Sequence, residues 1–190
     1  MSTIQIDLGG GATIALPAEK AVTALMQRLQ GLQGLPPAAR PHYQVGEYAA
    51  GQGGIFAGTI LGDDGVTYGL IISEEQDIGR YRWGPDGELD LSEWDGLGNT
   101  NRLNNSDHPA AFQAARYEKD GHLDFYLPSR REMMVMLANV PKLFNENSWY
   151  WTSTPRSESY AWAVDFEHGN VSYNYRVNEF RVRPVRRFPL

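Results

Sequence analysis

Cysteine is absent from this sequence of 190 residues, and long hydrophobic runs and an excess of positive charge are missing as well. Without cysteine the chain can form no disulfide, thiolate metal site or cysteine nucleophile. The net charge of −6 argues against a general nucleic-acid binder, because neutralising phosphates requires a basic surface. The residues after Met1 contain neither a basic segment nor a long apolar run. We therefore expect no signal peptide, no membrane insertion and synthesis in the cytoplasm.

Motifs for catalysis and metal binding are also missing. The four histidines are scattered and lack the paired spacing of a metal site, and no nucleophile elbow, phosphate-binding loop or dinucleotide fingerprint occurs. The acidic stretch from Gly84 to Gly96 suggests a calcium loop, but Leu91 and Gly96 occupy the positions where an EF-hand needs Gly and Glu. We expect a non-enzymatic protein with no catalytic residues, no cofactor and no metal.

Aromatic residues are abundant, at 12% of the chain, and they gather between Trp149 and Phe180. Such clustering is typical of a packed β core or of a recognition surface, since Tyr and Trp combine large apolar area with a polar group. The aromatic content alone is compatible with both a packed β core and a recognition surface.

The sequence of residues 1–42 predicts a separate appendage followed by a linker. Ile4 and Ile6 alternate with polar residues before a triple-glycine turn, which predicts a hairpin, and an amphipathic helix follows Pro17. The segment PPAARP cannot be helix interior and reads as a stiff linker. We expect residues 1–35 to form a hairpin and helix for oligomerisation or docking, residues 36–42 a Pro-rich linker, and residues 43–190 a ligand-binding domain.

The sequence pattern of residues 43–190 predicts strands, then two helices, then further strands. Apolar runs at 55–61 and 66–72 flank an Asp-Gly turn, which is a strong hairpin signal. One helix begins near Asp107-His108-Pro109, with Asp107 as its cap, and a second begins at the capping box Ser129 to Glu132. The strand AWAVDF follows and pairs with a returning stretch, residues 169–188. This order predicts an α+β domain.

Alternation in the returning stretch divides its side chains between two faces. We expect Val171, Tyr173, Tyr175 and Val177 to fill the core, because one parity of a half-buried antiparallel strand faces inward. The opposite parity then faces solvent: Ser172, Asn174, Arg176 and Asn178. Such a polar face suits ligand binding, but it also suits any exposed strand, and the sequence leaves both readings open.

The segments LPSRRE, WTSTP and VRPVRR resemble the Lcl C-terminal-like domain family, over roughly residues 43 to 188. This is a bacterial and prophage group with a C-type-lectin-like fold. The resemblance implies antiparallel strands flanked by two helices, with the N- and C-terminal strands of the domain paired. It also implies a binding module, and some similar domains are phage tropism determinants and variable proteins of diversity-generating retroelements.

The resemblance assigns framework roles and contact roles along the chain. The framework positions are Trp151, Thr152, Ser153, Trp162, Gly169, Arg183, Pro184, Val185 and Arg186. The candidate ligand contacts are Arg156, Glu158, Ser159, Tyr160, Asp165, Glu167, His168, Asn170, Ser172, Asn174, Arg176 and Asn178. The calcium and sugar signatures of animal lectins are absent, and so are the cysteines of the related formylglycine-generating enzymes.

The leading hypothesis is a phage or prophage protein that binds a bacterial surface protein or glycan, located in the virion tail after cytoplasmic synthesis. One alternative is a structural component of a phage tail or baseplate that contacts other tail proteins through residues 1–35. Another is a hydrolase of surface polysaccharide with a carboxylate such as Asp165, and a cytoplasmic location is a further alternative. We expect a homo-oligomer, because weak sites gain avidity when presented together.

Overall fold

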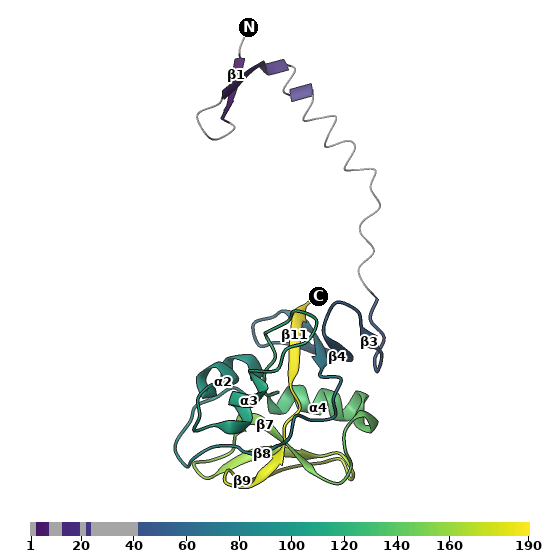
Figure 1. Cartoon of the computed structure of the whole chain (residues 1–190), viewed down its shortest axis with the longest axis vertical. Helices are drawn as coiled ribbons and strands as arrows, with labels where there is room; N and C mark the ends of the chain where they lie inside the picture. The colour runs from purple at the N-terminus through teal and green to yellow at the C-terminus, as the bar shows by residue number, and fades with distance from the viewer. Residues whose placement is uncertain (1–2, 8–12, 20–21, 24–41) are drawn as a thin grey trace. The chain divides into compact units, whose positions relative to one another are not determined.

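The computed structural model describes residues 3–7, 13–19, 22–23 and 42–190, and the chain divides into two units, Met1–His42 and Tyr43–Leu190. In the first unit, β1 (Thr3–Asp7) pairs antiparallel with β2 (Thr13–Pro17), which confirms the predicted hairpin (Figure 1). Most of the predicted amphipathic helix and of the 36–42 linker lies outside the described residues. Within the described ranges, no helix has the length and apolar character needed to cross a membrane.

The second unit contains a four-stranded antiparallel sheet that includes both ends of the domain. Its order is β11 (Val185–Pro189), β5 (Thr67–Ile72), β4 (Gly54–Leu61) and β3 (Tyr48–Ala49). The predicted hairpin between β4 and β5 is confirmed. The C-terminal strand shares a sheet with the first strands of the domain, as the resemblance implied, although it pairs with β5 and not with β3.

A second sheet of five strands carries the C-terminal hairpins. Its order is β6 (Arg80–Arg82), β10 (Glu179–Arg181), β7 (Trp149–Pro155), β8 (Tyr160–Asp165) and β9 (Asn170–Tyr175). All neighbours are antiparallel except β10 and β7.

The predicted pairing of AWAVDF with the returning stretch is confirmed for β9, but residues 169–188 continue beyond it into two further strands. The stretch forms β9 and β10 in the five-stranded sheet and then β11 in the four-stranded sheet. Pro184 lies at the crossing between the two sheets, where its missing N–H interrupts no ladder bond.

Three α-helices occur in residues 42–190, one more than predicted: α2 (Gly96–Leu103), α3 (Pro109–Ala114) and α4 (Arg130–Asn139), followed by a short 3-10 turn, η1 (Pro141–Leu143). The capping box at Ser129 is confirmed, with its side chain accepting from the Glu132 N–H. The predicted cap of α3 is wrong, because His108 and not Asp107 is its N-cap residue. Helix α2 was not predicted, because its sequence GLGNTNRL has two glycines and little apolar periodicity.

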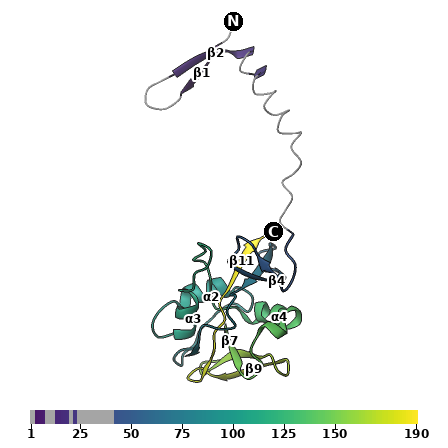
Figure 2. The same cartoon turned by 45° about the vertical axis from the view of Figure 1, so that its right-hand side comes forward.

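Two large hydrophobic cores result from this arrangement, beside a smaller cluster of Ala49, Phe56 and Ile71. Helix α4 contacts β4 of one sheet and β7 and β8 of the other, and it lies between the sheets in both views (Figures 1 and 2). Helices α2 and α3 cover the opposite face of the five-stranded sheet, above Trp83, Trp151 and Ala163. The α+β class is confirmed, and the mostly antiparallel strands are consistent with a C-type-lectin-like fold.

Candidate ligand-binding surface

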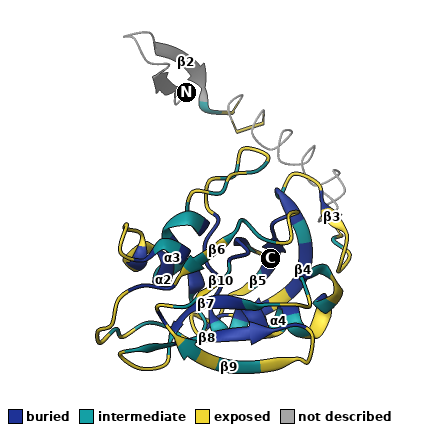
Figure 3. Cartoon of the chain, turned by 60° about the horizontal axis from the view of Figure 1, so that its bottom comes forward, coloured by how far each residue is buried: buried dark blue, intermediate teal, exposed yellow. Residues whose placement is uncertain are grey.

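The bulky side chains of the last hairpin face solvent. Tyr173 is 48% exposed, Tyr175 is 53% exposed and Val177 is 58% exposed. Figure 3 shows the same contrast, since β8 is largely buried while β9 beside it alternates between intermediate and exposed residues. The prediction that these side chains fill the core is wrong.

The start of α4 explains this exposure. Along one face of β8, Val164 and the following Phe166 belong to the core beneath α4. Trp162, two residues earlier on the same face, is covered by Arg130, the first residue of the helix. Tyr160 lies one further step along the strand, beyond the helix start, and is only partly buried. The sheet face therefore continues outside the core as an open surface.

Four aromatic side chains form a continuous cluster on this face, which we call the aromatic ladder: Tyr160, Trp162, Tyr173 and Tyr175. Tyr160 lies opposite Tyr175 and Trp162 lies opposite Tyr173 in the β8–β9 register. Ring centroids are 4.4 Å apart for Tyr160 and Tyr175, 5.4 Å for Tyr160 and Tyr173, and 5.8 Å for Trp162 and Tyr173. A hydrogen bond with Tyr175 raises the pKa of the Tyr160 hydroxyl. The cross-strand contacts hold the rings in a defined surface.

Two arginines adjoin the aromatic ladder. The Arg130 guanidinium lies 3.8 Å from the centroid of the Trp162 ring and pairs with Glu93 at 3.3 Å. Arg156 lies 5.9 Å from the Trp162 ring and 5.6 Å from the Tyr173 ring. Because Arg156 is exposed, its cation–π contacts leave guanidinium N–H groups available to a ligand.

A groove of about 720 Å³ opens next to the ladder, and Arg156, which contacts two rings of the ladder, also lines the groove. One wall comes from residues 88–93 and the other from residues 154–158. Four carboxylates line it: Glu88, Asp90, Glu93 and Glu158. The groove and the ladder together offer apolar rings, hydrogen-bonding groups and charges of both signs over one open surface.

Arg176, predicted to contact ligand, is instead buried, with 1% of its surface exposed. Its guanidinium donates to the carbonyl oxygens of Ser157 at 2.6 Å, Gly87 at 3.0 Å and Pro85 at 3.1 Å, and lies 4.5 Å from the Trp83 ring. Burial lowers the pKa of Arg176. These bonds connect the loop before one wall of the groove to the loop that forms the other wall, so Arg176 positions the groove.

The polar residues of β9 that were predicted to face solvent are also partly buried. Ser172 and Asn174 are partly buried opposite Ala163 and Ala161, on the sheet face that carries the second core. The Asn174 side-chain oxygen accepts hydrogen bonds from the Tyr175 N–H and the Asn178 amide. Ser159 is partly buried and Glu158 is exposed in the groove. The predicted parity is thus inverted for Tyr173, Tyr175 and Arg176, whereas Val171 packs against the first core as predicted.

Four other candidate residues lie at the opposite end of the hairpin, in the turn between β8 and β9. Asp165 Oδ1 accepts the Glu167 N–H at 2.9 Å, while Oδ2 lies 3.1 Å from His168 Nδ1 and 3.3 Å from Asn170 Nδ2. Although burial raises the pKa of Asp165, these hydrogen bonds outweigh burial and lower it. Ligand atoms of Asp165, Glu167 and His168 lie within 4.8 Å of one another, a donor set that could hold a cation. The turn hydrogen bonds account for the arrangement without one.

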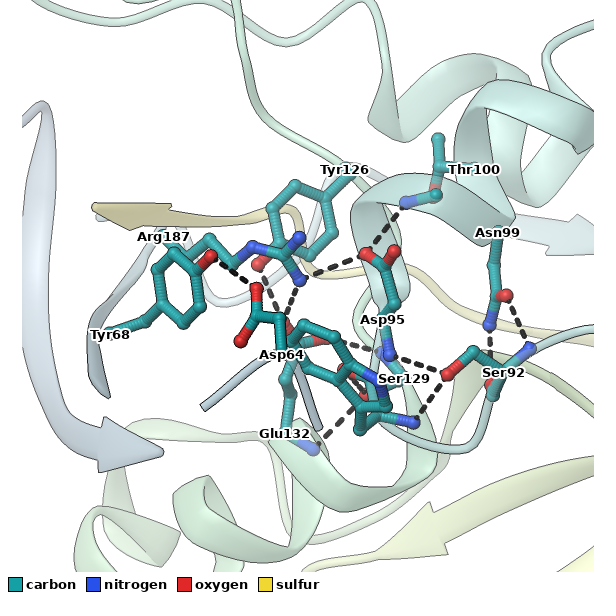
Figure 4. Close-up of polar contacts among 12 residues, drawn as sticks. Asp64, Tyr68, Ser92, Asp95, Asn99, Thr100, Tyr126, Ser129, Glu132 and Arg187 are labelled. Carbon is teal, nitrogen blue, oxygen red and sulfur yellow. Dashed lines mark hydrogen bonds and ion pairs between the residues drawn. The ribbon is translucent and has the colours of Figure 1, made fainter. Parts of the chain in front are cut away.

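A partly buried ionic cluster connects β11 to the start of α4, where Arg187 Nη1 lies 3.9 Å from Glu132 Oε1 (Figure 4). Arg187 lies 4.8 Å from the Tyr68 ring, and its Nη1 is 2.9 Å from Asp95 Oδ1. Burial raises the pKa of Glu132, whose Oε1 accepts the Tyr126 hydroxyl at 2.6 Å. This cluster holds the helix start, and therefore Arg130, in place beside the ladder.

The match to a family model covers residues 82–186, and its description is Lcl C-terminal domain. The chain belongs to the Lcl C-terminal domain family. No curated protein matches the sequence significantly. The Lcl C-terminal domain match includes the aromatic ladder, the groove and the turn between β8 and β9, whereas residues 1–81 lie outside it.

Most framework positions assigned to the Lcl C-terminal domain are buried. The buried framework residues are Trp151, Thr152, Ser153, Arg183, Pro184, Val185 and Arg186. Trp162 is only partly buried and belongs to the ladder, and Gly169 is an exposed turn residue with φ of 71°. The candidate contacts predicted from the sequence did not include Trp162, Tyr173, Tyr175 or Arg130. Their place on this surface depends on where α4 begins, which the sequence of β8 and β9 does not encode.

Proposed function

We propose that this Lcl C-terminal domain protein is a non-enzymatic binding protein of phage or prophage origin that recognises a bacterial surface protein or glycan. The observation that carries the proposal is the exposed aromatic ladder beside an open groove. We place the protein in the virion tail, where such a surface meets the host cell.

The chemistry of the surface supports recognition. Tyr and Trp provide large contact areas at low entropic cost, because each side chain has only two rotatable χ angles. Here cross-strand contacts already order the rings, so little conformational entropy remains to be lost on binding. The groove beside them adds polar groups that give specificity.

A binding assay with labelled protein on bacterial cells and on a glycan array tests the proposal. The double variant Tyr173→Ala and Tyr175→Ala should lose at least tenfold in affinity, because central aromatic contacts contribute about 2 kcal/mol or more to binding. Tyr48→Ala is the matched control, since Tyr48 is also exposed, at 41%, but lies on β3 of the other sheet.

Two results would overturn the proposal. One is equal binding by the ladder variant and the wild type, and the other is a folded wild-type protein that binds no host surface. Release of reducing ends from a host polysaccharide, abolished by Glu158→Gln, would instead establish a hydrolase.

A further inference from the structure

Strand β9 forms one edge of the five-stranded sheet, and the register shows which of its backbone groups are open. The Arg176 N–H bonds to the Ser159 carbonyl, next to the pair Tyr160 and Tyr175. Because bonding alternates along an antiparallel ladder, Ser172 and Asn174 direct their backbone groups toward β8. Val171, Tyr173 and Tyr175 direct theirs toward the open edge.

The outward groups of Tyr175 are already occupied. Its N–H donates to Asn174 Oδ1 at 3.0 Å, and its carbonyl accepts the Asn178 N–H at 3.0 Å. In the part of the chain that the structure describes, the outward N–H and C=O groups of Val171 and Tyr173 have no such partner. Two donors and two acceptors therefore stand open on a short, defined length of β9.

The other sheet edges in residues 43–190 carry features that oppose strand pairing. Strand β6 presents the charges of Arg80 and Arg82, β11 contains two arginines and Pro189, and β3 has only two residues. Charges, proline and short length are the usual protection of an edge. Strand β9, with the sequence NVSYNY, contains no charge and no proline.

The open edge of β9 is complementary to itself. When two copies meet antiparallel with Ser172 opposite Ser172, each Val171 lies opposite the second copy's Tyr173, and the open donors and acceptors pair fully. The uncharged strand meets no like charge in this arrangement. Asn174 fixes the register by occupying the N–H of Tyr175.

We propose that the protein forms a two-fold dimer in which the β9 edges of two copies pair antiparallel around Ser172. The two five-stranded sheets then become one continuous sheet. The two aromatic ladders meet on one surface, so a repeated ligand would be bound at both sites. The dimer does not depend on the ligand-binding proposal, because it requires only backbone groups.

Sedimentation equilibrium of the full chain over a range of concentrations tests the dimer. Tyr173→Pro and Tyr173→Ala both remove the ring, but only proline removes the outward N–H, which no bond to β8 uses. We expect Tyr173→Pro to dissociate roughly tenfold or more readily than Tyr173→Ala. Equal dissociation of the two variants would overturn the proposal, as would a wild type that stays monomeric.

A cysteine placed at the two-fold axis tests the register directly, because the chain has no cysteine of its own. Opposed residues at such a position lie about 4.5 Å apart between Cα atoms, within the range of a disulfide. Ser172→Cys should form a covalent dimer under mild oxidation much faster than Glu118→Cys, an exposed control. Equal rates for the two variants would assign any dimer to another surface and overturn the proposal. Circular dichroism confirms that each variant is folded.

Discussion

At the scale of single residues, the role of a side chain depends on which sheet face its strand covers. Arg176 and Tyr175 are neighbours in sequence, yet Arg176 is 1% exposed and Tyr175 is 53% exposed. The guanidinium is tolerated inside because backbone carbonyls from two loops satisfy its N–H groups. A polar residue in an alternating pattern is therefore not evidence of a solvent-facing position.

Replacing Arg176 by alanine should destabilise the protein by about 2–4 kcal/mol, because buried carbonyl oxygens lose their donors and a cavity opens beside Trp83. Arg176→Lys should recover only part of this loss, since one ammonium cannot reach both loops. Urea denaturation measures the change. A change within about 0.5 kcal/mol would mean that Arg176 acts as a surface residue, as the sequence had suggested.

At the scale of elements, local signals predicted the hairpins and the capped start of α4, but not the cap of α3. The Asp-Gly turn between β4 and β5 and the capping box of α4 are both present. Helix α2 also has a capping residue, Asp95, whose side chain accepts the Gly98 N–H at 2.9 Å, but its two glycines and weak apolar periodicity hid it, and packing on β7 helps to stabilise it. The hairpin of β8 and β9 was also predicted, and Asp165 closes its turn.

Replacing Asp165 by asparagine should weaken that hairpin in a pH-dependent way. The folded-state pKa of Asp165 is lowered, so the ionised carboxylate stabilises the fold above its unfolded pKa of about 3.9, and this stability is lost as the pH falls through the lower folded value. Asp165→Asn should cost about 1–2 kcal/mol at pH 7. The difference from wild type should shrink below about pH 4 in urea titrations. A constant difference down to pH 3 would contradict this account.

At the scale of the whole molecule, the C-terminal strand completes the larger unit. Strand β11 pairs with β5 along its full length, and the buried Val185 exchanges two backbone hydrogen bonds with Tyr126, at 2.8 and 2.9 Å. Residues from both ends of Tyr43–Leu190 therefore belong to one sheet, and this unit is compact without Met1–His42.

Truncations test this division. A chain of residues 43–190 should melt within a few degrees of the same unit in the full chain, because, among the described residues, its hydrophobic clusters use none before Tyr43. Removing residues 185–190 should abolish cooperative unfolding, since it removes Val185 from the core and leaves β5 unpaired on one side. Thermal melts by circular dichroism measure both. Cooperative folding without β11, or failure of 43–190 to fold, would contradict the assignment.

The sequence by itself determined the hairpins, the capped start of α4, the α+β class and the family, because each rests on neighbouring residues or on short motifs. Only the tertiary structure decided which face of β9 meets solvent. Alternation divides a strand into two faces, but α4 covers one of them only as far as Arg130. Tyr173 and Tyr175 lie beyond that cover, while the opposite face holds Arg176 against Trp83. Periodicity along a strand cannot encode where a distant helix begins, so the tyrosines expected in the core became the candidate binding surface.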